Sequence, residues 1–273
     1  VDVEEKVLFA RRAVAVAREE RIRQKALYEL GKQLCTNPLT LEEGVSFLNQ
    51  AVTLNPSTKL APEIQFKIAE ILHASSDSQA ALNAYNRYLE SYDVPVFAVR
   101  VRQGKGRLLV AMARFDEALT MFLEAAEFAT EVSLKTALLL EAAEAATAAK
   151  RYSSAIEIYR GLLREGARTG IPLRLARCLE ASGDKEGARR EYAAVRDDVS
   201  SSEQDVFTAV MRLAGMLIEE NRVIDAIAEY TRLSAVLTRE ELKCSVLLER
   251  GRAYYKLDKL QLAIEDFAKV TDS

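Results

Sequence analysis

The sequence offers little support for acid–base or nucleophilic catalysis. It contains one histidine, His73, so a Ser-His-Asp or Cys-His arrangement would have to be built around that side chain. His73 follows Leu72 near the end of a predicted helix, which is a poor position for a catalytic base. We therefore predict that the chain is not an enzyme. Several carboxylates with strongly shifted pKa values in one deep pocket would reverse this prediction.

A short glycine-containing segment, Gln103-Gly104-Lys105-Gly106, resembles a phosphate-binding loop. The full glycine spacing, the Ser or Thr after the lysine and the preceding strand are all missing. We interpret Gly104 and Gly106 instead as small residues at a helix-packing position.

Metal and disulfide chemistry are also poorly supported. The three cysteines, Cys35, Cys178 and Cys244, are odd in number, far apart and set in apolar helical patterns. No CxxC, HExxH or aspartate-rich calcium loop occurs. We expect reduced thiols in a cytoplasmic protein, with no metal and no cofactor.

Charged residues are numerous but balanced, with 38 Lys and Arg against 41 Asp and Glu and a net charge of −3. This balance gives no general attraction to nucleic acid or to a membrane surface. Two local basic runs occur, one of Arg100, Arg102, Lys105 and Arg107, the other of Arg160, Arg164 and Arg168. Nucleic-acid binding through them is a weaker alternative, because no exposed aromatic residues are interleaved with them. Paired carboxylates such as Asp197-Asp198 are interpreted as solvated surface.

The elements that must carry these residues are helical. About half of the residues are hydrophobic, and many of these are Ala and Leu. The sequence also has five Pro and no Trp, and this composition favours helices over strands. No uncharged apolar stretch of about 18 residues occurs, so we predict no membrane-spanning segment. The first residues carry neither an initiator Met nor a signal-peptide pattern, and we expect the chain to be part of a longer protein.

A small residue recurs along the chain and sets a repeat register. It stands at Gly44, Ala81, Ala118, Ala155, Ala188, Ala226 and Ala263, at intervals of 37, 37, 37, 33, 38 and 37 residues. Four positions later a large apolar or aromatic residue follows, at Leu48, Tyr85, Phe122, Tyr159, Tyr192, Tyr230 and Phe267. A further residue, Ala, Tyr, Leu or Val, follows three positions after that. Spacing of four and then three places all three positions on one face of a helix.

A second small residue precedes each of these by twelve positions, or by thirteen in the first unit. It stands at Gly31, Ala69, Gly106, Ala143, Ala176, Ala214 and Gly251. An apolar residue follows three positions on, so each unit is expected to contain two amphipathic helices, A and B. Polar breaks such as Asn37-Pro38 and Ser182-Gly183-Asp184 would supply the turns and N-caps between them.

This succession of small, large and aromatic residues resembles the tetratricopeptide repeat (TPR) family. The last unit shows it most fully, in Gly251, Tyr254, Ala263 and Phe267, and Pro56 matches the proline that closes the family's repeat. The resemblance covers essentially the whole chain. It implies an all-α fold, a right-handed α-α superhelix built as a solenoid.

Two features depart from the family pattern. Most intervals exceed the family's usual length of about 34 residues. Two helix-A positions, Lys105 and Arg250, are charged where the pattern prefers an apolar residue. Loops or helices must therefore be longer than is usual in the family.

We expect residues 1–22 to form the B helix of an incomplete repeat or an N-terminal cap. Seven helix pairs would follow in one continuous solenoid over 23–273, at about 23–57, 60–93, 97–130, 134–167, 169–197, 205–237 and 242–273. A repeat buries its apolar face mainly against its neighbours, so we expect further repeats beyond these ends unless the terminal helices are true caps. An exposed terminal face would also allow self-association.

In the TPR family the A helices line a concave groove that holds a segment of a partner protein. The resemblance places groove residues at Lys25, Tyr28, Lys32, Phe66, Arg107, Leu140, Arg177 and Arg252. They would offer apolar anchors, and arginines for carboxylates of the partner. Lys25 and Lys32 imitate only part of the carboxylate clamp of some co-chaperones, so we do not expect that mode of recognition.

These expectations favour a non-catalytic protein–protein interaction module, a scaffold or adaptor segment of a larger multiprotein assembly. The alternative is a regulatory or sensor domain whose effector module lies outside this chain. The fold alone does not choose between them.

Overall fold

The computed structural model describes residues 3–75, 77–92 and 95–271. Every regular element in these ranges is helical, which confirms the predicted all-α class. The chain divides into two compact units, Val1–Ala149 and Lys150–Ser273. Residues 1, 93 and 273, which are the first or last residues of three expected segments, lie outside the described residues.

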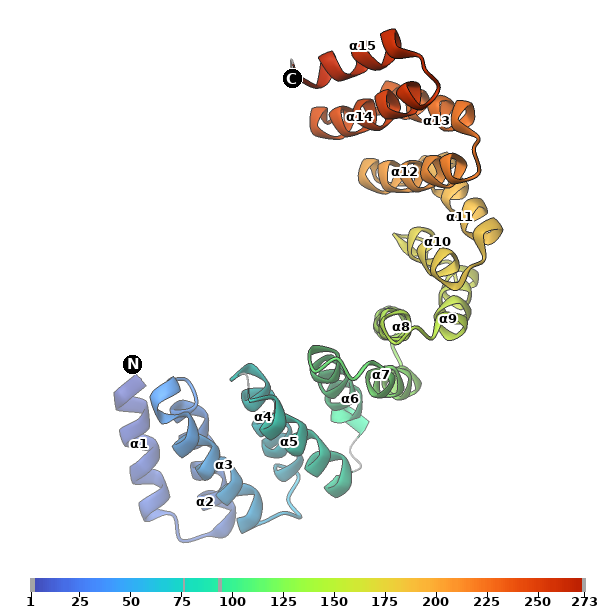
Figure 1. The fold of residues 1–273 in the computed structure, drawn as a ribbon. Coiled ribbons are helices and arrows are strands. Elements are labelled where there is room, and N and C mark those ends of the chain that lie inside the picture. The colour runs from blue at the N-terminus through green and yellow to red at the C-terminus, as the bar shows by residue number, and fades with distance from the viewer. Residues whose placement is uncertain (1–2, 76, 93–94, 272–273) are drawn as a thin grey trace. The chain divides into compact units, whose positions relative to one another are not determined.

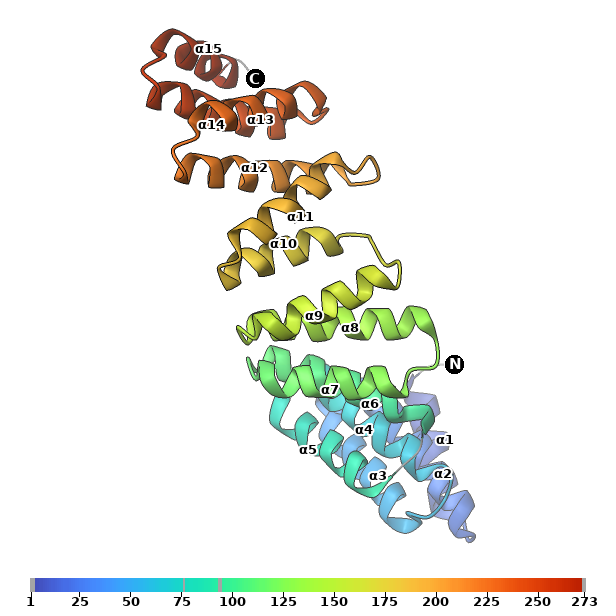
Figure 2. The same ribbon diagram turned by 90° about the vertical axis from the view of Figure 1, so that its right-hand side faces the viewer.

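Both units are built of helices joined by short turns (Figures 1 and 2). Unit 1 contains α1 (Val3–Val16), α2 (Glu20–Leu34), the 3-10 helix η1 (Pro38–Thr40), α3 (Leu41–Leu54), α4 (Ala61–Ala74), α5 (Ser78–Ser91), α6 (Pro95–Ala111), α7 (Phe115–Phe128) and α8 (Val132–Ala148). Unit 2 contains α9 (Tyr152–Arg164), α10 (Ile171–Ser182), α11 (Lys185–Asp197), α12 (Glu203–Glu219), α13 (Val223–Val236), α14 (Glu240–Lys256) and α15 (Leu260–Thr271).

Helices that follow one another in the sequence pack together within each unit. In unit 1, α2 packs with α3, α4 with α5 and α6 with α7, and the even-numbered helices also meet where α4 contacts α6. In unit 2, α9 and α11 both pack on α10, α12 packs with α13, and α14 with α15. The division between the units falls between α8 and α9, inside the segment 134–167 that the sequence assigns to one helix pair. The seven helix pairs and the single continuous solenoid stay predictions.

The residues of the repeat register form the core. Gly44 and the six alanines of the register are buried, and so are the large residues four positions on, from Leu48 to Tyr230. Only Phe267, in α15, is half-buried. Burial of one large apolar side chain stabilises a fold by roughly 1.5–3 kcal/mol. The residues that reveal the repeat in the sequence are thus the ones that hold its helices together.

The two glycines of the 103–106 segment are explained by helix packing. The segment lies inside α6, where a Cβ at Gly106 would lie 2.7 Å from the Phe122 ring. A Cβ at Gly104 would lie 2.5 Å from the hydroxyl oxygen of Tyr85. Both distances are too short for a carbon atom, which confirms that these glycines let helices approach closely.

Four turns share one backbone arrangement at the end of an even-numbered helix. A residue with positive φ follows the helix at Ala113, Gly183, Asn221 and Asp258. The next N–H group then donates to a carbonyl five residues back, as from Arg114 to Leu109 at 2.8 Å. This is the hydrogen bond that closes a helix in the Schellman motif. Only Gly183 adopts positive φ without steric cost, which for other residues is roughly 1–2 kcal/mol.

The first helix, α1, has no buried residue. Ala10 and Val14 of this helix are half-buried, and α1 packs on α2. Within the described ranges, no helix has both the length and the apolar character needed to cross a bilayer.

Candidate functional site

Six of the eight predicted groove residues lie in unit 1. They lie on α2, α4, α6 and α8, whose common surface we call the A-helix face of unit 1. The other two, Arg177 and Arg252, lie on α10 and α14 of unit 2. The structure thus divides the predicted site between two units.

The α2 part of this face is largely closed by internal contacts. Tyr28 is buried, and its hydroxyl donates a 3.0 Å hydrogen bond to Glu63 Oε1 on α4. Burial and the Glu63 carboxylate raise the pKa of Tyr28 above its usual value, so the phenol stays protonated. Lys32 lies over the Tyr28 ring, with its Nζ 4.6 Å from the centroid. Tyr28 therefore offers little surface to a partner, whereas Lys25 is exposed; that either residue lines a groove stays a prediction.

A hollow of about 470 Å³ lies between α4 and α6. Phe66 and Tyr85 supply aromatic walls, although Phe66 itself is only 4% exposed. Arg100 lies at the rim, with its guanidinium carbon 4.8 Å from the Phe66 centroid and its Nη2 3.1 Å from Glu70 Oε1. The hollow therefore combines aromatic surface with an oriented guanidinium.

His73 also lines this hollow, but without the partners of a catalytic residue. Its Nδ1 lies 3.1 Å from the Tyr85 hydroxyl. Burial, assisted by the negative charge of Glu70, raises the pKa of Tyr85 to about 12, so the phenol is neutral near pH 7. The pair can offer a hydrogen-bonding edge to a ligand.

The centre of the A-helix face is an ion pair between successive even-numbered helices. Arg107 on α6 donates from Nε to Glu141 Oε2 at 3.0 Å and from Nη2 to Glu141 Oε1 at 2.7 Å. Gln103 donates to the same carboxylate at 2.8 Å. These hydrogen bonds raise the pKa of Arg107 above its usual value. The Arg107 side chain is 59% exposed. The ion pair holds its guanidinium facing solvent and leaves Nη1 available to a ligand.

A second hollow, of about 260 Å³, lies beyond this ion pair. Arg107 lines it as well, together with apolar surface from Val110, Phe115 and Ala148. Leu140, half-buried on α8, is the residue before Glu141. Two hollows with aromatic or apolar walls therefore meet at one exposed arginine.

The two predicted residues of unit 2 have different surroundings. Arg177 is exposed on α10, and no described side chain pairs with it. Arg252 lies 2.5 Å from Glu249, one turn away on α14. Neighbouring Arg212 on α12 pairs with Glu180 of α10, which also accepts a 2.8 Å hydrogen bond from Tyr192.

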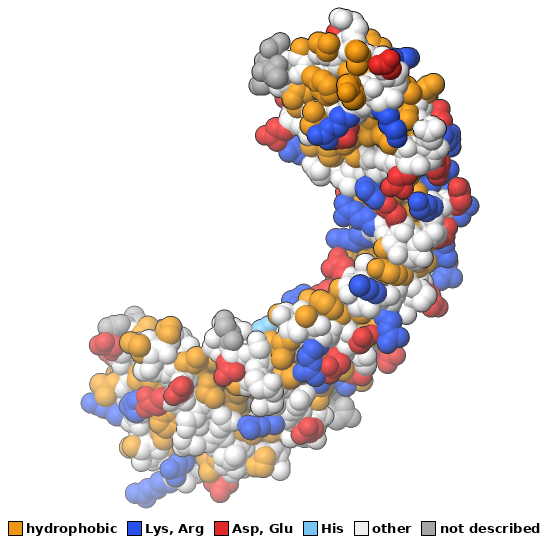
Figure 3. All heavy atoms as spheres, viewed as in Figure 1, with side chains coloured by type: hydrophobic (Ala, Val, Ile, Leu, Met, Phe, Trp, Pro, Cys, Tyr) orange, Lys and Arg blue, Asp and Glu red, His pale blue; other side chains and the backbone are white. Residues whose placement is uncertain are grey.

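The basic run of α6 does not form a continuous positive strip. Arg102 lies 3.1 Å from Glu124 and 4.5 Å from the Phe128 centroid, whereas Arg107 belongs to the A-helix face. Lys105 is half-buried, and desolvation lowers its pKa below the usual value. Blue and red side chains are interspersed over both units on the face that Figure 3 shows. This arrangement gives little support to binding of a phosphate backbone.

Sequence reasoning did not assign Arg100, Glu141 or the edge formed by His73 and Tyr85 to the groove. Arg107 and Glu141 are 34 residues apart, close to one repeat length, so a search for opposite charges separated by one repeat would have found their pairing. Among the described residues, no group of three or more His, Cys, Asp or Glu side chains could hold a metal ion.

Comparison with known proteins agrees with this architecture. Residues 104–168, from α6 to the loop after α9, match the family model of the tetratricopeptide repeat. Among curated proteins, none matches this sequence.

Solved structures of similar fold include the apo form of RapI and the complex of Naa15/Naa10 bound to HypK-THB. RapI has 13% identity and a TM-score of 0.52, covering 99% of this chain and 83% of its own. The Naa15/Naa10 match has 16% identity and a TM-score of 0.53, covering 92% of this chain and 38% of the other. PilF of Pseudomonas aeruginosa has 19% identity and a TM-score of 0.46, covering 80% and 95%. These identities show the fold alone.

The resemblance to the TPR family is thus confirmed by sequence over residues 104–168, and the chain shares its fold with solved structures over most of its length. Repeats of this kind indicate a protein–protein interaction module.

Proposed function

We propose that this chain is a non-catalytic scaffold or adaptor segment that binds an extended segment of a partner protein on the A-helix face of unit 1. The observation that carries the proposal is the meeting of two hollows at Arg107. A bound segment would place one side chain in each hollow, with its backbone crossing the guanidinium between them.

The polar groups of this face suit an extended chain. Arg107 uses Nε and Nη2 for Glu141, so its Nη1 is left to donate to a backbone carbonyl or a carboxylate of the partner. Arg100 is 60% exposed and uses Nη2 for Glu70. Since both guanidiniums are already oriented, the entropic cost of ordering them when a partner binds would be reduced.

Binding of another protein has a parallel in one structure of similar fold, since Naa15/Naa10 was solved bound to HypK-THB. We also propose a cytoplasmic location, because Cys35 and Cys244 form no disulfide with a described residue and reduced thiols are typical of that compartment.

The test is quantitative affinity capture from the source cell with variants that fill a hollow. Ala74 and Ala148 are exposed and line the first and second hollow, so Ala74→Trp and Ala148→Trp fill these spaces without disturbing the core. Ala13→Trp, on exposed α1, is the matched control. We expect both hollow-filling variants and Arg107→Glu to lose the same partner at least tenfold, and the control to retain it. Capture unchanged by all three would refute the proposed face.

A charge exchange makes the test specific for the central ion pair. The double variant Arg107→Glu with Glu141→Arg keeps an ion pair but reverses its direction. We expect it to keep the helical circular dichroism of the wild type while still failing to capture a partner that depends on Arg107.

A further inference from the structure

A larger hollow lies in unit 2. It measures about 750 Å³ and is bounded by α9, α10 and α11. Ile156 and Leu163 of α9 form its apolar wall, and Leu175 and Leu179 of α10 form its floor. The two floor residues are buried and the two wall residues half-buried, so apolar surface is accessible inside the hollow.

The packing of three helices explains this hollow. Helices α9 and α11 each pack on α10, which has 12 residues and belongs to the one short interval, 33 residues from Ala155 to Ala188. Ile156, Arg160 and Leu163 are spaced by four and then three residues, so they share one face of α9. That face therefore presents a cation between two apolar side chains.

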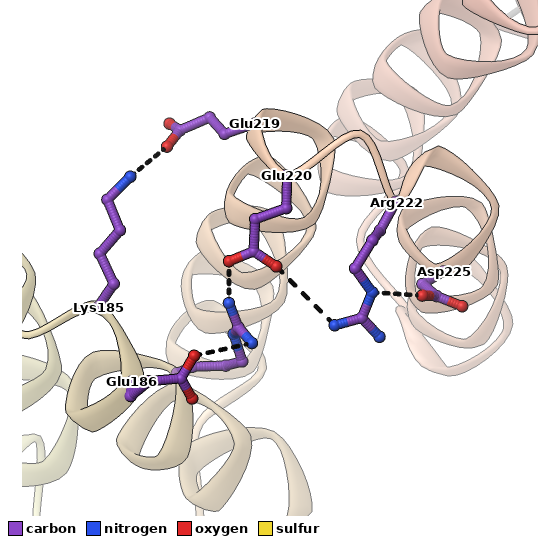
Figure 4. A network of polar contacts seen from close by, with 7 residues as sticks. Lys185, Glu186, Glu219, Glu220, Arg222 and Asp225 are labelled. Carbon is purple, nitrogen blue, oxygen red and sulfur yellow. Dashed lines mark hydrogen bonds and ion pairs between the residues drawn. The ribbon is translucent and has the colours of Figure 1, made fainter.

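The cations of the hollow are not neutralised by the protein. Arg160 and Arg164 are exposed, and neither forms an ion pair with a described acidic side chain. Two cations of α11 behave differently, as Figure 4 shows for Lys185, whose Nζ lies 3.2 Å from Glu219. Arg189, also on α11, pairs with both Glu186 and Glu220.

Carboxylates at the hollow decide which kind of ligand fits. Glu157, Asp184 and Glu191 line it together with the two arginines. They would repel a polyphosphate chain, whereas a protein segment can place one carboxylate at the arginines and avoid the acidic positions. Arg160 and Arg164 lie in the C-terminal half of α9, which fixes where the partner's carboxylate must be.

We infer that this hollow binds a short amphipathic helical segment of another protein. Two apolar side chains of that segment, three or four residues apart, would enter the hollow, and an Asp or Glu within one turn would pair with Arg160 and Arg164. The chain would then carry a second interaction surface, independent of Arg107.

The test uses a displayed library of random 16-residue peptides, selected on the whole chain and counter-selected on the variant Arg160→Glu with Arg164→Glu. We expect the recovered peptides to contain the apolar pair and the neighbouring acid. In fluorescence anisotropy they should bind the wild type at least tenfold more tightly than the double variant. Arg190→Glu, at an exposed arginine of α11 outside the hollow, is the matched control and should leave affinity unchanged.

A second variant keeps the test valid if the charge reversal perturbs the fold. Ser153 is exposed and lines the hollow, so Ser153→Trp fills it without changing charge and should also weaken binding tenfold. Peptides that lack acids, that bind all variants equally, or that cannot be recovered at all would overturn the inference. Binding of a 20-residue oligo(dT) with the same dependence on Arg160 and Arg164 would overturn it in favour of nucleic acid.

Discussion

Arg250 and Asp266 form a two-bonded ion pair that is almost completely buried. Arg250 donates from Nε and Nη2 to the two carboxylate oxygens of Asp266, each at 2.7 Å, and the side chains are 13% and 3% exposed. Arg250 also donates to the Thr231 hydroxyl at 3.2 Å, so the pair joins α13, α14 and α15. This contact explains why a charge stands where the repeat pattern prefers an apolar residue.

Removing one member of this pair should be far more costly than replacing both. Asp266→Ala leaves a guanidinium without its partner, and we expect a loss of about 3–5 kcal/mol in the free energy of unfolding. Arg250→Met combined with Asp266→Leu should recover most of that loss. Urea denaturation followed by circular dichroism measures both. Glu265→Ala, at the exposed preceding residue, is the control, and an equal loss in that variant would contradict the prediction.

The segment that connects α3 and α4 should be held in place by hydrogen bonds to Gln24. It is 1% exposed and donates to the carbonyls of Ala51 and Asn55 at 2.9 and 2.8 Å, while its oxygen accepts from the Thr58 hydroxyl at 2.9 Å. We expect Gln24→Ala to lower the free energy of unfolding by about 1–3 kcal/mol, because buried groups lose their partners. Proteolysis of the 55–60 segment should also become faster.

The control for this prediction is Gln50→Ala. Gln50 is exposed and its amide makes only a 3.4 Å hydrogen bond to Ser46. Equal proteolysis of the two variants would show that Gln24 does not fix the segment.

Glu180 should make unit 2 sensitive to acid. Burial alone would raise its pKa, but hydrogen bonds from Arg212 and Tyr192 hold it below the usual value. A carboxylate with a depressed folded-state pKa contributes stability above its unfolded pKa of about 4.3, and this contribution is lost as the pH falls through the folded-state pKa. We expect the free energy of unfolding to fall as the pH drops below the unfolded pKa of about 4.3, and to fall less in Glu180→Gln.

The comparison requires urea titrations of both proteins at several pH values. Glu186→Gln is the matched control, because Glu186 is 72% exposed on the same unit. If the free energy of unfolding of Glu180→Gln falls with pH as steeply as that of the wild type, Glu180 does not cause the sensitivity to acid.

Cys35 should be slow to alkylate in the folded chain. Burial raises the pKa of its thiol to about 11, so at pH 8 only about one molecule in a thousand carries the reactive thiolate. An ordinary thiol with a pKa of about 8.5 would be roughly one-quarter ionised. We expect iodoacetamide to modify Cys35 at least a hundredfold faster in urea than in buffer, as measured by peptide mass spectrometry. Equal rates would mean that the thiol is not buried in solution.

The sequence by itself determined the repeat. Small residues at 44, 81, 118 and later positions, each followed by a large residue after four, encode a helix face that must be buried. This information is local, because spacings of three and four follow from helix geometry alone. The helical class and the packing role of Gly104 and Gly106 followed from the same pattern.

Only the tertiary structure decided which side chains remain available on these helices. Tyr28 and Arg107 both occupy predicted groove positions, yet Tyr28 is buried against Glu63 while Arg107 is exposed between two hollows. Likewise, Arg160 is unpaired although Arg189 on a neighbouring helix is paired twice. These differences depend on how closely helices from different repeats approach and on the direction of each long side chain, and helical periodicity specifies neither.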